Sequence, residues 1–467
     1  MTATMLTLAS EGEPVIDYAS TGFLIVCASL VLLMTTPALA LFYGGMSRAK
    51  SVLNMMMMSF GAMGIVGILY VLFGYSMSFG PNDIGGIIAN PFDKFGLKDT
   101  AGLINPFGYD GYGNIPELAF VGFQLTFAVI TVALISGAIA DRVKFSTWMV
   151  FSAIWVTLAY FPVAHMVWGG GLLSGSESGL SAKIFGSTDG VADVLPIDFA
   201  GGTVVHINAG MAGLVLALVI GKRLGFGQVA MRPHNVPLVM IGAGLLWFGW
   251  FGFNAGSELA PDGTAALVWI NTTVATCAAM LGWLLVEKLR DGHATSIGAA
   301  SGVVAGLVAI TPACGALSPV GSIVLGVVAG GLSAMAVGLK FRFGFDDSLD
   351  VVGVHLVAGL WGTIGAGLLS TSTGLLYGGG IKQTVIQIVI ALVAVIVSGV
   401  MTTAIALALK ATMGWRITED AEISGIDQRE HAESAYDLND RGGRIGSGIL
   451  AGLTQRSAEP VTEGASA

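Results

Sequence analysis

Two histidines, His206 and His355, lie inside long apolar stretches of this chain. An aspartate precedes each of them by eight positions, Asp198 in one case and Asp347 in the other, and the same spacing of Ala-Gly and Gly follows each. A polar ring in a hydrocarbon environment costs free energy and usually marks a functional position. A pattern repeated in two parts of a chain indicates a duplicated transporter whose site lies between the repeats.

The chemistry that such a histidine pair offers is hydrogen bonding without fixed charge. An apolar environment disfavours the imidazolium form, and a neutral imidazole has one donor and one acceptor nitrogen. Two such rings in contact would line a narrow path suited to a small neutral polar molecule, and they could also relay protons. The alternative is two separately satisfied core histidines. A zinc or copper site would need further ligands at suitable spacing, so we expect no metal.

Aromatic residues near the ends of apolar stretches form a second candidate group. Phe123 and Phe127 lie four positions apart, as do Phe253 and Ser257, so each pair shares a helix face. Trp168 closes an apolar stretch just before three glycines. Aromatic faces attract cations, and a hydroxyl can accept a hydrogen bond from one. The group therefore suits a small monovalent cation, and the alternative is an interfacial aromatic belt.

The two aspartates have more than one interpretation. Each lies near the expected start of a helix, where free backbone N–H groups stabilise a carboxylate. Asp198 could be a proton acceptor, a cation attractor or a helix cap. Asp347 is its counterpart at the other histidine, and we expect a structural role for it.

The composition is that of a membrane protein. Of 467 residues, 54% are hydrophobic and 11% are charged, whereas a soluble protein carries roughly 25% charged residues. The 68 glycines favour closely packed membrane helices. Three cysteines give no disulfide framework. The net charge of −9 gives no sign of nucleic-acid binding. The neutral histidine path lacks the paired nucleophile and base that an enzyme needs, so we expect no enzymatic activity.

Eleven apolar segments are expected to be helices that cross the bilayer, which requires about 20 residues each. They cover residues 20–44, 52–79, 117–140, 146–170, 200–221, 237–256, 264–286, 296–312, 319–339, 351–370 and 384–410. With the N-terminus outside, the 21 Lys and Arg residues fall on the inner side except for Lys94, Lys98, Lys183 and Lys382. The positive-inside rule therefore favours an N-terminus out and a C-terminus in.

The predicted fold class is an all-α polytopic membrane protein with an inverted repeat of five plus five helices and one further helix. An odd number of helices per half inverts the second half relative to the first. Each histidine follows its aspartate by about 12 Å along a helix, and half of the hydrocarbon core is about 15 Å. Entering from opposite faces, both imidazoles would meet near the midplane.

Three parts of the chain are expected. Residues 1–19 form an extracytoplasmic segment that lacks the basic start of a signal peptide, so we expect it to be retained. Residues 20–414 form the transmembrane domain, with extracytoplasmic loops at 80–116 and 172–197. Residues 415–467 form a charged cytoplasmic regulatory tail, partly ordered to about Asp440 and disordered after it.

These motifs resemble the ammonium transporter (Amt/Mep/Rh) family, and within it the bacterial Amt branch. The matching segments are residues 123–128 (FQLTFA), 164–171 (AHMVWGGG), 198–208 (DFAGGTVVHIN), 249–257 (GWFGFNAGS), 311–315 (TPACG), 350–355 (DVVGVH) and 425–436 in the tail. The resemblance covers nearly the whole chain in order, and the segment from Asp198 to Asn208 is the most specific.

The resemblance implies a homotrimer in the plasma membrane with one pore per subunit and no cofactor. Phe127, Trp168 and Ser257 would form the outer ammonium site, and Phe127 and Phe253 would form a stacked gate below it. His206 and His355 would be the twin histidines of the pore, with Asp198 supporting the outer site. The tail would regulate conduction, and a PII-type signalling protein is its candidate partner.

The expected function is ammonium uptake, in which NH4+ is recruited outside, loses a proton and crosses as NH3. Whether the proton returns by a separate route, which would make transport electrogenic, stays open. One alternative is an ammonium sensor with low flux, although 53 tail residues leave no room for a fused signalling domain. Another is an Rh-like gas channel, which the aromatic outer set argues against.

Overall fold

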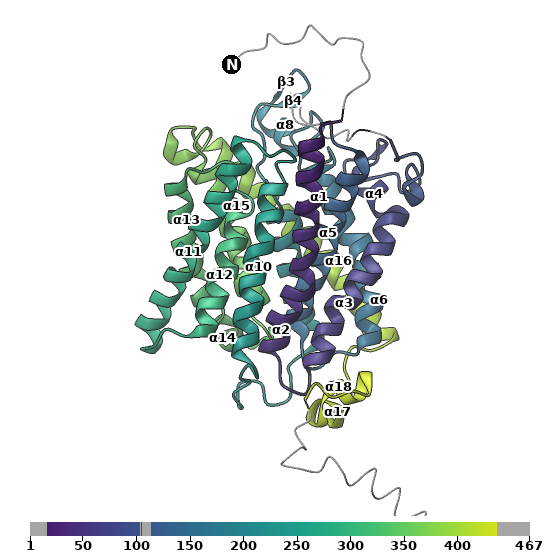
Figure 1. Cartoon of the computed structure of the whole chain (residues 1–467), viewed down its shortest axis with the longest axis vertical. Coiled ribbons are helices and arrows are strands. Elements are labelled where there is room, and N and C mark those ends of the chain that lie inside the picture. Colours follow the sequence, from purple (N-terminus) through teal and green to yellow (C-terminus); the bar gives the residue numbers. More distant parts are fainter. Residues whose placement is uncertain (1–15, 103, 105–113, 437–467) are drawn as a thin grey trace, which may run out of the picture.

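The computed structural model describes residues 16–102, 104 and 114–436. Most of the expected N-terminal segment 1–19, and the part of the tail expected to be disordered after about Asp440, lie outside the described residues. Figure 1 shows a bundle of long helices that run roughly along the vertical axis of the view.

Ten helical segments of the described residues are long and apolar enough to cross a membrane. Several contain a π-helical or 3₁₀ turn between α-helical parts. In chain order they are α1 (Tyr18–Leu33), η1 (Met34–Leu39) and α2 (Ala40–Met46); α3 (Val52–Leu69), η2 (Tyr70–Gly74) and α4 (Tyr75–Phe79); α5 (Glu117–Ile135) and η4 (Ser136–Ile139); α6 (Phe145–Trp155), η5 (Val156–Tyr160) and α7 (Phe161–Trp168); η6 (Gly202–Ile207) and α9 (Asn208–Ile220); α10 (Val236–Gly256); α11 (Gly263–Asp291); α13 (Pro319–Ala336) and α14 (Leu339–Phe343); η7 (Val352–Val357) and α15 (Ala358–Leu369); and α16 (Lys382–Thr412).

The eleventh predicted segment is also helical but shorter. It corresponds to α12 (Ser296–Ile310), which has 15 residues, fewer than the roughly 20 that cross a bilayer as a straight helix. Residues 300–310 of α12 are all buried, so this helix lies inside the bundle. The helical, multi-span fold class is confirmed, whereas eleven crossings, the orientation and the inverted repeat stay predictions.

The remaining elements are short and lie at the two ends of the bundle. They are β1 (Asp83–Ile84), β2 (Ile88–Ala89), η3 (Phe95–Leu97), α8 (Leu180–Phe185), β3 (Ser187–Thr188), β4 (Val191–Ala192), η8 (Leu375–Tyr377), α17 (Glu419–Ser424) and α18 (Ile426–His431). Strands β1 and β2 pair antiparallel, as do β3 and β4. In Figure 1, α8 and the β3–β4 hairpin lie at the top, and α17 and α18 lie at the bottom. We call these the hairpin end and the tail end.

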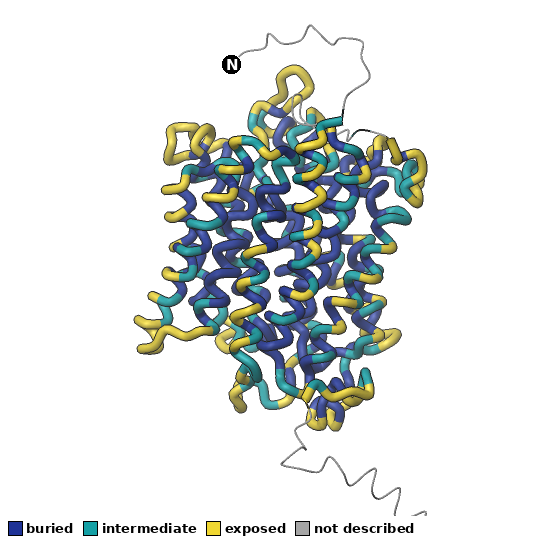
Figure 2. The backbone as a smooth tube through the Cα atoms, in the orientation of Figure 1, coloured by how far each residue is buried: buried dark blue, intermediate teal, exposed yellow. Residues whose placement is uncertain are grey.

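The outer surface of the bundle is apolar, as a lipid environment requires. Large hydrophobic side chains on the spans are exposed, among them Ile68, Leu218 and Ile396. Figure 2 shows the buried backbone gathered inside the bundle and much of the exposed backbone at its ends and edges. Backbone polar groups are satisfied within the helices, which is the condition for crossing hydrocarbon.

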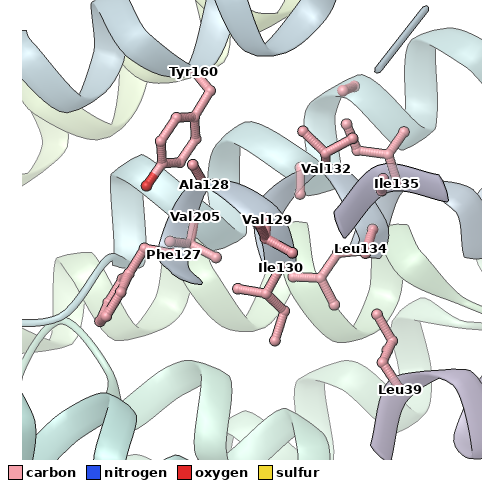
Figure 3. Close-up of a cluster of buried hydrophobic side chains, with 14 of the residues drawn as sticks. Leu39, Phe127, Ala128, Val129, Ile130, Val132, Leu134, Ile135, Tyr160 and Val205 are labelled. Carbon is pink, nitrogen blue, oxygen red and sulfur yellow. The ribbon is translucent and has the colours of Figure 1, made fainter. Parts of the chain in front are cut away.

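Helix α5 lies at the centre of the bundle and carries Phe127. All residues from Thr126 to Ile135 are buried, and a helix that is apolar on every side is expected to be interior. Figure 3 shows its side chains beside Leu39 of η1, Tyr160 of η5 and Val205 of η6. These contacts fix the position of α5 relative to η6, which carries the first of the two histidines.

Glycines allow two other helices to approach closely. A Cβ added at Gly326 of α13 would lie 2.2 Å from the Ala275 carbonyl oxygen of α11, and one at Gly330 would lie 2.0 Å from that of Ala279. A side chain at either position would therefore force the two backbones apart. This packing is the one that a glycine-rich membrane sequence predicts.

Candidate functional site

The two histidines of the repeated pattern meet inside the bundle. His206 lies in η6 and His355 in η7, and both side chains are buried. Their Nδ1 atoms are 3.3 Å apart, and their ring planes differ by 17°. A hydrogen bond between these two atoms needs one ring to donate and the other to accept, so a single proton shared between neutral rings satisfies the pair.

The second ring nitrogen of His206, Nε2, is buried and is left without a hydrogen-bond partner among the described residues. A buried polar atom without a partner costs free energy, and a small polar molecule in contact with it would remove that cost. Trp250 of α10 stacks on the same ring, with centroids 5.4 Å apart, and holds the ring in place.

Two phenylalanines stack directly beside the histidines. The rings of Phe127 and Phe253 have centroids 4.1 Å apart and are inclined by 19°. The Phe253 centroid is 6.1 Å from that of His206. Both phenylalanines are fully buried, so the stack separates the histidine pair from the space on its other side.

That space is a cavity of about 650 Å³. Trp168 lines it and meets the Phe127 ring edge-on, with centroids 5.9 Å apart. Ser257 lines it too, and its hydroxyl donates to the Phe253 carbonyl at 2.9 Å. The lining also includes residues of the loop that carries the β3–β4 hairpin, such as Val191 and Leu195, so the cavity belongs to the hairpin end.

Asp198 lines the cavity and is tied to the turn that carries His206. Its carboxylate accepts from the backbone N–H groups of Gly201, Gly202, Thr203 and Val204, and from the Thr203 hydroxyl. Its carbonyl accepts from the Trp168 indole at 2.9 Å. Burial raises the pKa of the Asp198 carboxyl, while the hydrogen bonds from Thr203 oppose that rise. The carboxylate thus caps η6 and fixes Trp168.

Asp347 caps η7 as Asp198 caps η6, by accepting from backbone N–H groups. Its carboxylate accepts from Val351 N–H at 3.1 Å and from Val352 N–H at 2.8 Å. Burial, and then the nearby charge of Asp350, raise its pKa to about 6. Lys340 donates to the Asp350 carboxylate at 2.6 Å, so this end of the repeat has a charged partner that Asp198 lacks.

The structure therefore brings the sequence-predicted residues into one series of contacts. From the cavity inward the series is Trp168, Phe127, Phe253, His206 and His355. Ser257 and Asp198 flank its cavity side. Among the described residues, no cluster of three His, Cys, Asp or Glu side chains could hold a metal ion.

Two residues of this region were not singled out from the sequence. Trp250 stacks on His206 and donates to the Thr311 hydroxyl at 2.8 Å; its place in the segment 249–257, three positions before Phe253, is the signal that could have identified it. Glu258 lines the cavity directly after Ser257. Burial, and then the charge of Asp262, raise the pKa of Glu258 to about 7, and only the folded structure reveals that burial.

The chain is similar to known proteins over most of its length. The model of the Ammonium Transporter Family matches residues 22–436. An ammonium transporter of Mycobacterium bovis is 52% identical over 446 residues, covering 90% of this chain and 91% of the relative. One of Aquifex aeolicus is 45% identical over 438 residues, covering 92% and 96%.

Solved structures show the same fold. A protein described as a sensor Amt protein superposes with a TM-score of 0.78 at 28% identity, covering 88% of this chain and 98% of that one. Mep2 of Saccharomyces cerevisiae superposes with a TM-score of 0.73 at 30% identity, covering 86% and 91%. A family match over most of the length, together with relatives above 30% identity, means that the chain belongs to the Ammonium Transporter Family.

Proposed function

We propose that this multi-pass ammonium transporter recruits NH4+ at Phe127, Trp168 and Ser257, and passes NH3 along His206 and His355. The observation that carries the proposal is the unbroken series of contacts from the cavity to the histidine pair. The Phe127–Phe253 stack, with centroids 4.1 Å apart, closes the path between them and acts as a gate. Asp198 supports the site by holding Trp168 and the turn of His206.

The cavity suits a cation and the pore suits a neutral molecule. Aromatic faces such as those of Trp168 and Phe127 attract a small cation, and the Ser257 oxygen can accept a hydrogen bond from it. Beyond the stack the lining is apolar, and moving a bare ammonium ion there would cost many kcal/mol. Ammonia avoids that cost and still finds the unpartnered Nε2 atom of His206. Deprotonation therefore belongs on the cavity side of the stack.

The wider organisation follows the sequence prediction. In this proposal the transmembrane domain is residues 20–414, the hairpin end faces outward, the tail end faces the cytoplasm and the chain forms a homotrimer. The tail of residues 415–467 is regulatory, and a PII-type signalling protein is its candidate partner. The inward-facing tail is supported by the contacts of α18 with the starts of α3 and α6, because the basic residues beside those starts, Lys50 and Lys144, favour the cytoplasmic side.

The test is the current evoked by an ammonium pulse on solid-supported membranes carrying purified protein. His206→Leu and His355→Leu each remove the ring that lines the path, so conduction should fall by at least about tenfold, the equivalent of one lost hydrogen bond in the pore. His293→Leu is the matched control, because His293 is exposed in the loop after α11 and its loss should change nothing.

Three other outcomes would redirect the proposal. Unchanged conduction in both pore variants would show that the histidines do not line the path. Absence of current together with internal alkalinisation, read by an enclosed pH dye, would mean net NH3 passage without charge. Neither signal in folded wild-type protein would favour a sensor with little flux.

A further inference from the structure

His165 is a buried histidine that the transport path does not use. It lies in α7, three positions before Trp168, and its side chain is only 1% exposed. Its Nδ1 atom is 3.0 Å from the Ser78 carbonyl oxygen, and its Nε2 atom is 2.8 Å from the Asp83 carboxylate. Both partners are acceptors. Each ring nitrogen must therefore carry a hydrogen, and only the imidazolium form provides two donors.

The alternative position for the proton is on Asp83, and the surroundings oppose it. The Asp83 side chain is 50% exposed, and its two oxygens also accept from the Gly86 N–H at 2.9 and 3.0 Å. Water and a backbone donor both favour the ionised carboxylate. Two neutral glycines also lie against the ring, since a Cβ at Gly169 would lie 2.6 Å from Nδ1 and one at Gly171 would lie 3.0 Å from Cδ2.

The remaining charged groups of this region are engaged elsewhere. Lys94 and Glu117 form an ion pair, and Glu117 accepts from the Tyr75 hydroxyl of α4 at 2.6 Å. Among the described residues, Asp83 is thus the charged side chain in contact with the His165 ring. The imidazolium has one dedicated counter-ion, on a loop that comes from another part of the chain.

This ion pair holds a wall of the cavity. After Trp168 the chain turns back over His165, whose carbonyl accepts from Gly169 and Gly171 at 3.0 and 3.1 Å. Leu172 N–H donates to the Gly86 carbonyl at 2.8 Å, so the turn also docks on the loop of Asp83. Trp168, Gly170 and Leu173 of this turn line the cavity.

We propose that His165 is a positioning residue, held by Ser78 and Asp83, that clamps the 83–86 loop to the 169–173 turn and so places Trp168 for ammonium. The clamp itself rests on the contacts above. Its effect on ammonium recruitment rests on the proposed function of the cavity. The two parts are tested by separate measurements.

The clamp is tested by hydrogen–deuterium exchange of residues 169–173 in the full-length protein. Asp83→Ala removes the counter-ion, and exchange of these amides should accelerate by about tenfold, as for the loss of one charge-assisted hydrogen bond. Asp83→Asn is the matched control, because its amide can donate to a neutral Nε2 while its oxygen still accepts from Gly86. Asparagine should keep the wild-type protection. Equal protection in all three proteins would overturn the clamp.

The consequence for transport is tested by the half-saturating NH4+ concentration. His165→Gln carries both of its N–H donors on one nitrogen and can reach only one of the two acceptors, so half-saturation should rise several-fold while the maximal rate changes less. Asp83→Asn should stay near wild type. If exchange responds as expected but half-saturation does not, the clamp stands and its link to ammonium recruitment is wrong. If Trp168→Leu also leaves half-saturation unchanged, the outer-site assignment fails instead.

Discussion

The buried carboxylate of Asp198 at the cavity and those of Asp141 and Asp346 at the tail end are satisfied in different ways. At the hairpin end, Asp198 is satisfied by backbone N–H groups and a threonine hydroxyl. At the tail end, Asp141 and Asp346 share Arg223, at 3.0 and 2.8 Å. Neutral donors cap a helix and leave the carboxylate's charge acting on the cavity. Ion pairs cancel the charge and tie together loops that are far apart in sequence.

This difference between Asp198 and the Arg223-bound carboxylates fits the role of charge at each site. A cavity that receives a cation gains from an uncompensated negative charge nearby. The tail end instead docks α18 through carboxylates that cap other helices: Asp427 accepts from Asn54 N–H at the start of α3, and Glu430 accepts from Phe145 N–H at the start of α6. The tail therefore contacts the starts of both α3 and α6.

Breaking the Arg223 network should give the largest effect on stability. Arg223→Met leaves Asp141 and Asp346 buried without their main cation, which costs about 3–5 kcal/mol for a broken buried pair. The apparent melting temperature in detergent should fall steeply, and Asp346→Asn in the same chain should restore part of it. No fall in the single variant would mean that the network is not a stabilising element.

The same network predicts acid sensitivity. Burial alone would raise the pKa of Asp141 and of Asp346, but Arg223, together with Arg48 at Asp141 and Arg142 at Asp346, lowers both pKa values. Stabilisation from a lowered pKa is present above the ordinary value and is lost as the pH falls through the lowered one. Wild type should thus lose stability below about pH 4, near the ordinary pKa of aspartate, and Arg223→Met should lose less, as thermal scans across pH would show.

Asp198 and Asp347 provide a smaller, paired test. Asp198→Ala leaves four backbone N–H groups of η6 without their acceptor, and Asp347→Ala leaves two of η7. Loss of a helix cap costs about 0.5–2 kcal/mol, and Asp198 caps more N–H groups than Asp347, so the Asp198 variant should melt at the lower temperature. A reversed order would mean that water replaces the lost acceptor at η6.

Glu258 should give the cavity a modest pH dependence. Its pKa of about 7 means that the carboxyl is neutral below and charged above this pH. The charged form attracts NH4+, so half-saturation should fall as the pH rises through 7, by about threefold for one partly screened charge. Glu258→Gln should flatten the curve. Asp262→Asn, which removes the neighbouring charge, should move the change to lower pH.

The smallest effect is expected at the tail contact. Glu430→Gln keeps the acceptor for Phe145 N–H but loses its charge, which costs about 0.3–1 kcal/mol at a helix start. Limited proteolysis near α17 and α18 should become slightly faster. Glu433→Gln is the control, because Glu433 is exposed. Equal cleavage of both variants would leave no role for the Glu430 charge in docking.

Much of the fold could be predicted because it depends on local properties. Apolar length identified the helices, including α12, although its 15 residues could not decide whether it crosses alone. The repeated spacing pointed to His206 and His355 before their contact was known. The aromatic spacing pointed to Phe127, Phe253 and Ser257, although the sequence could not separate a cation site from an interfacial belt.

Other features depend on which surfaces meet. The stack of Trp250 on His206, the burial of Glu258, and the pairing of Arg223 with Asp346, 123 positions away, follow from helix packing rather than from nearby residues. His165 stood in the quoted segment 164–171, yet only the approach of Ser78 and Asp83 gave its ring two acceptors. The sequence by itself determined the apolar helices and the paired Asp–His spacing, because hydropathy and helical period are local. Only the tertiary structure decided which polar atoms gained partners, because a buried group's protonation and contacts depend on residues brought from elsewhere in the chain.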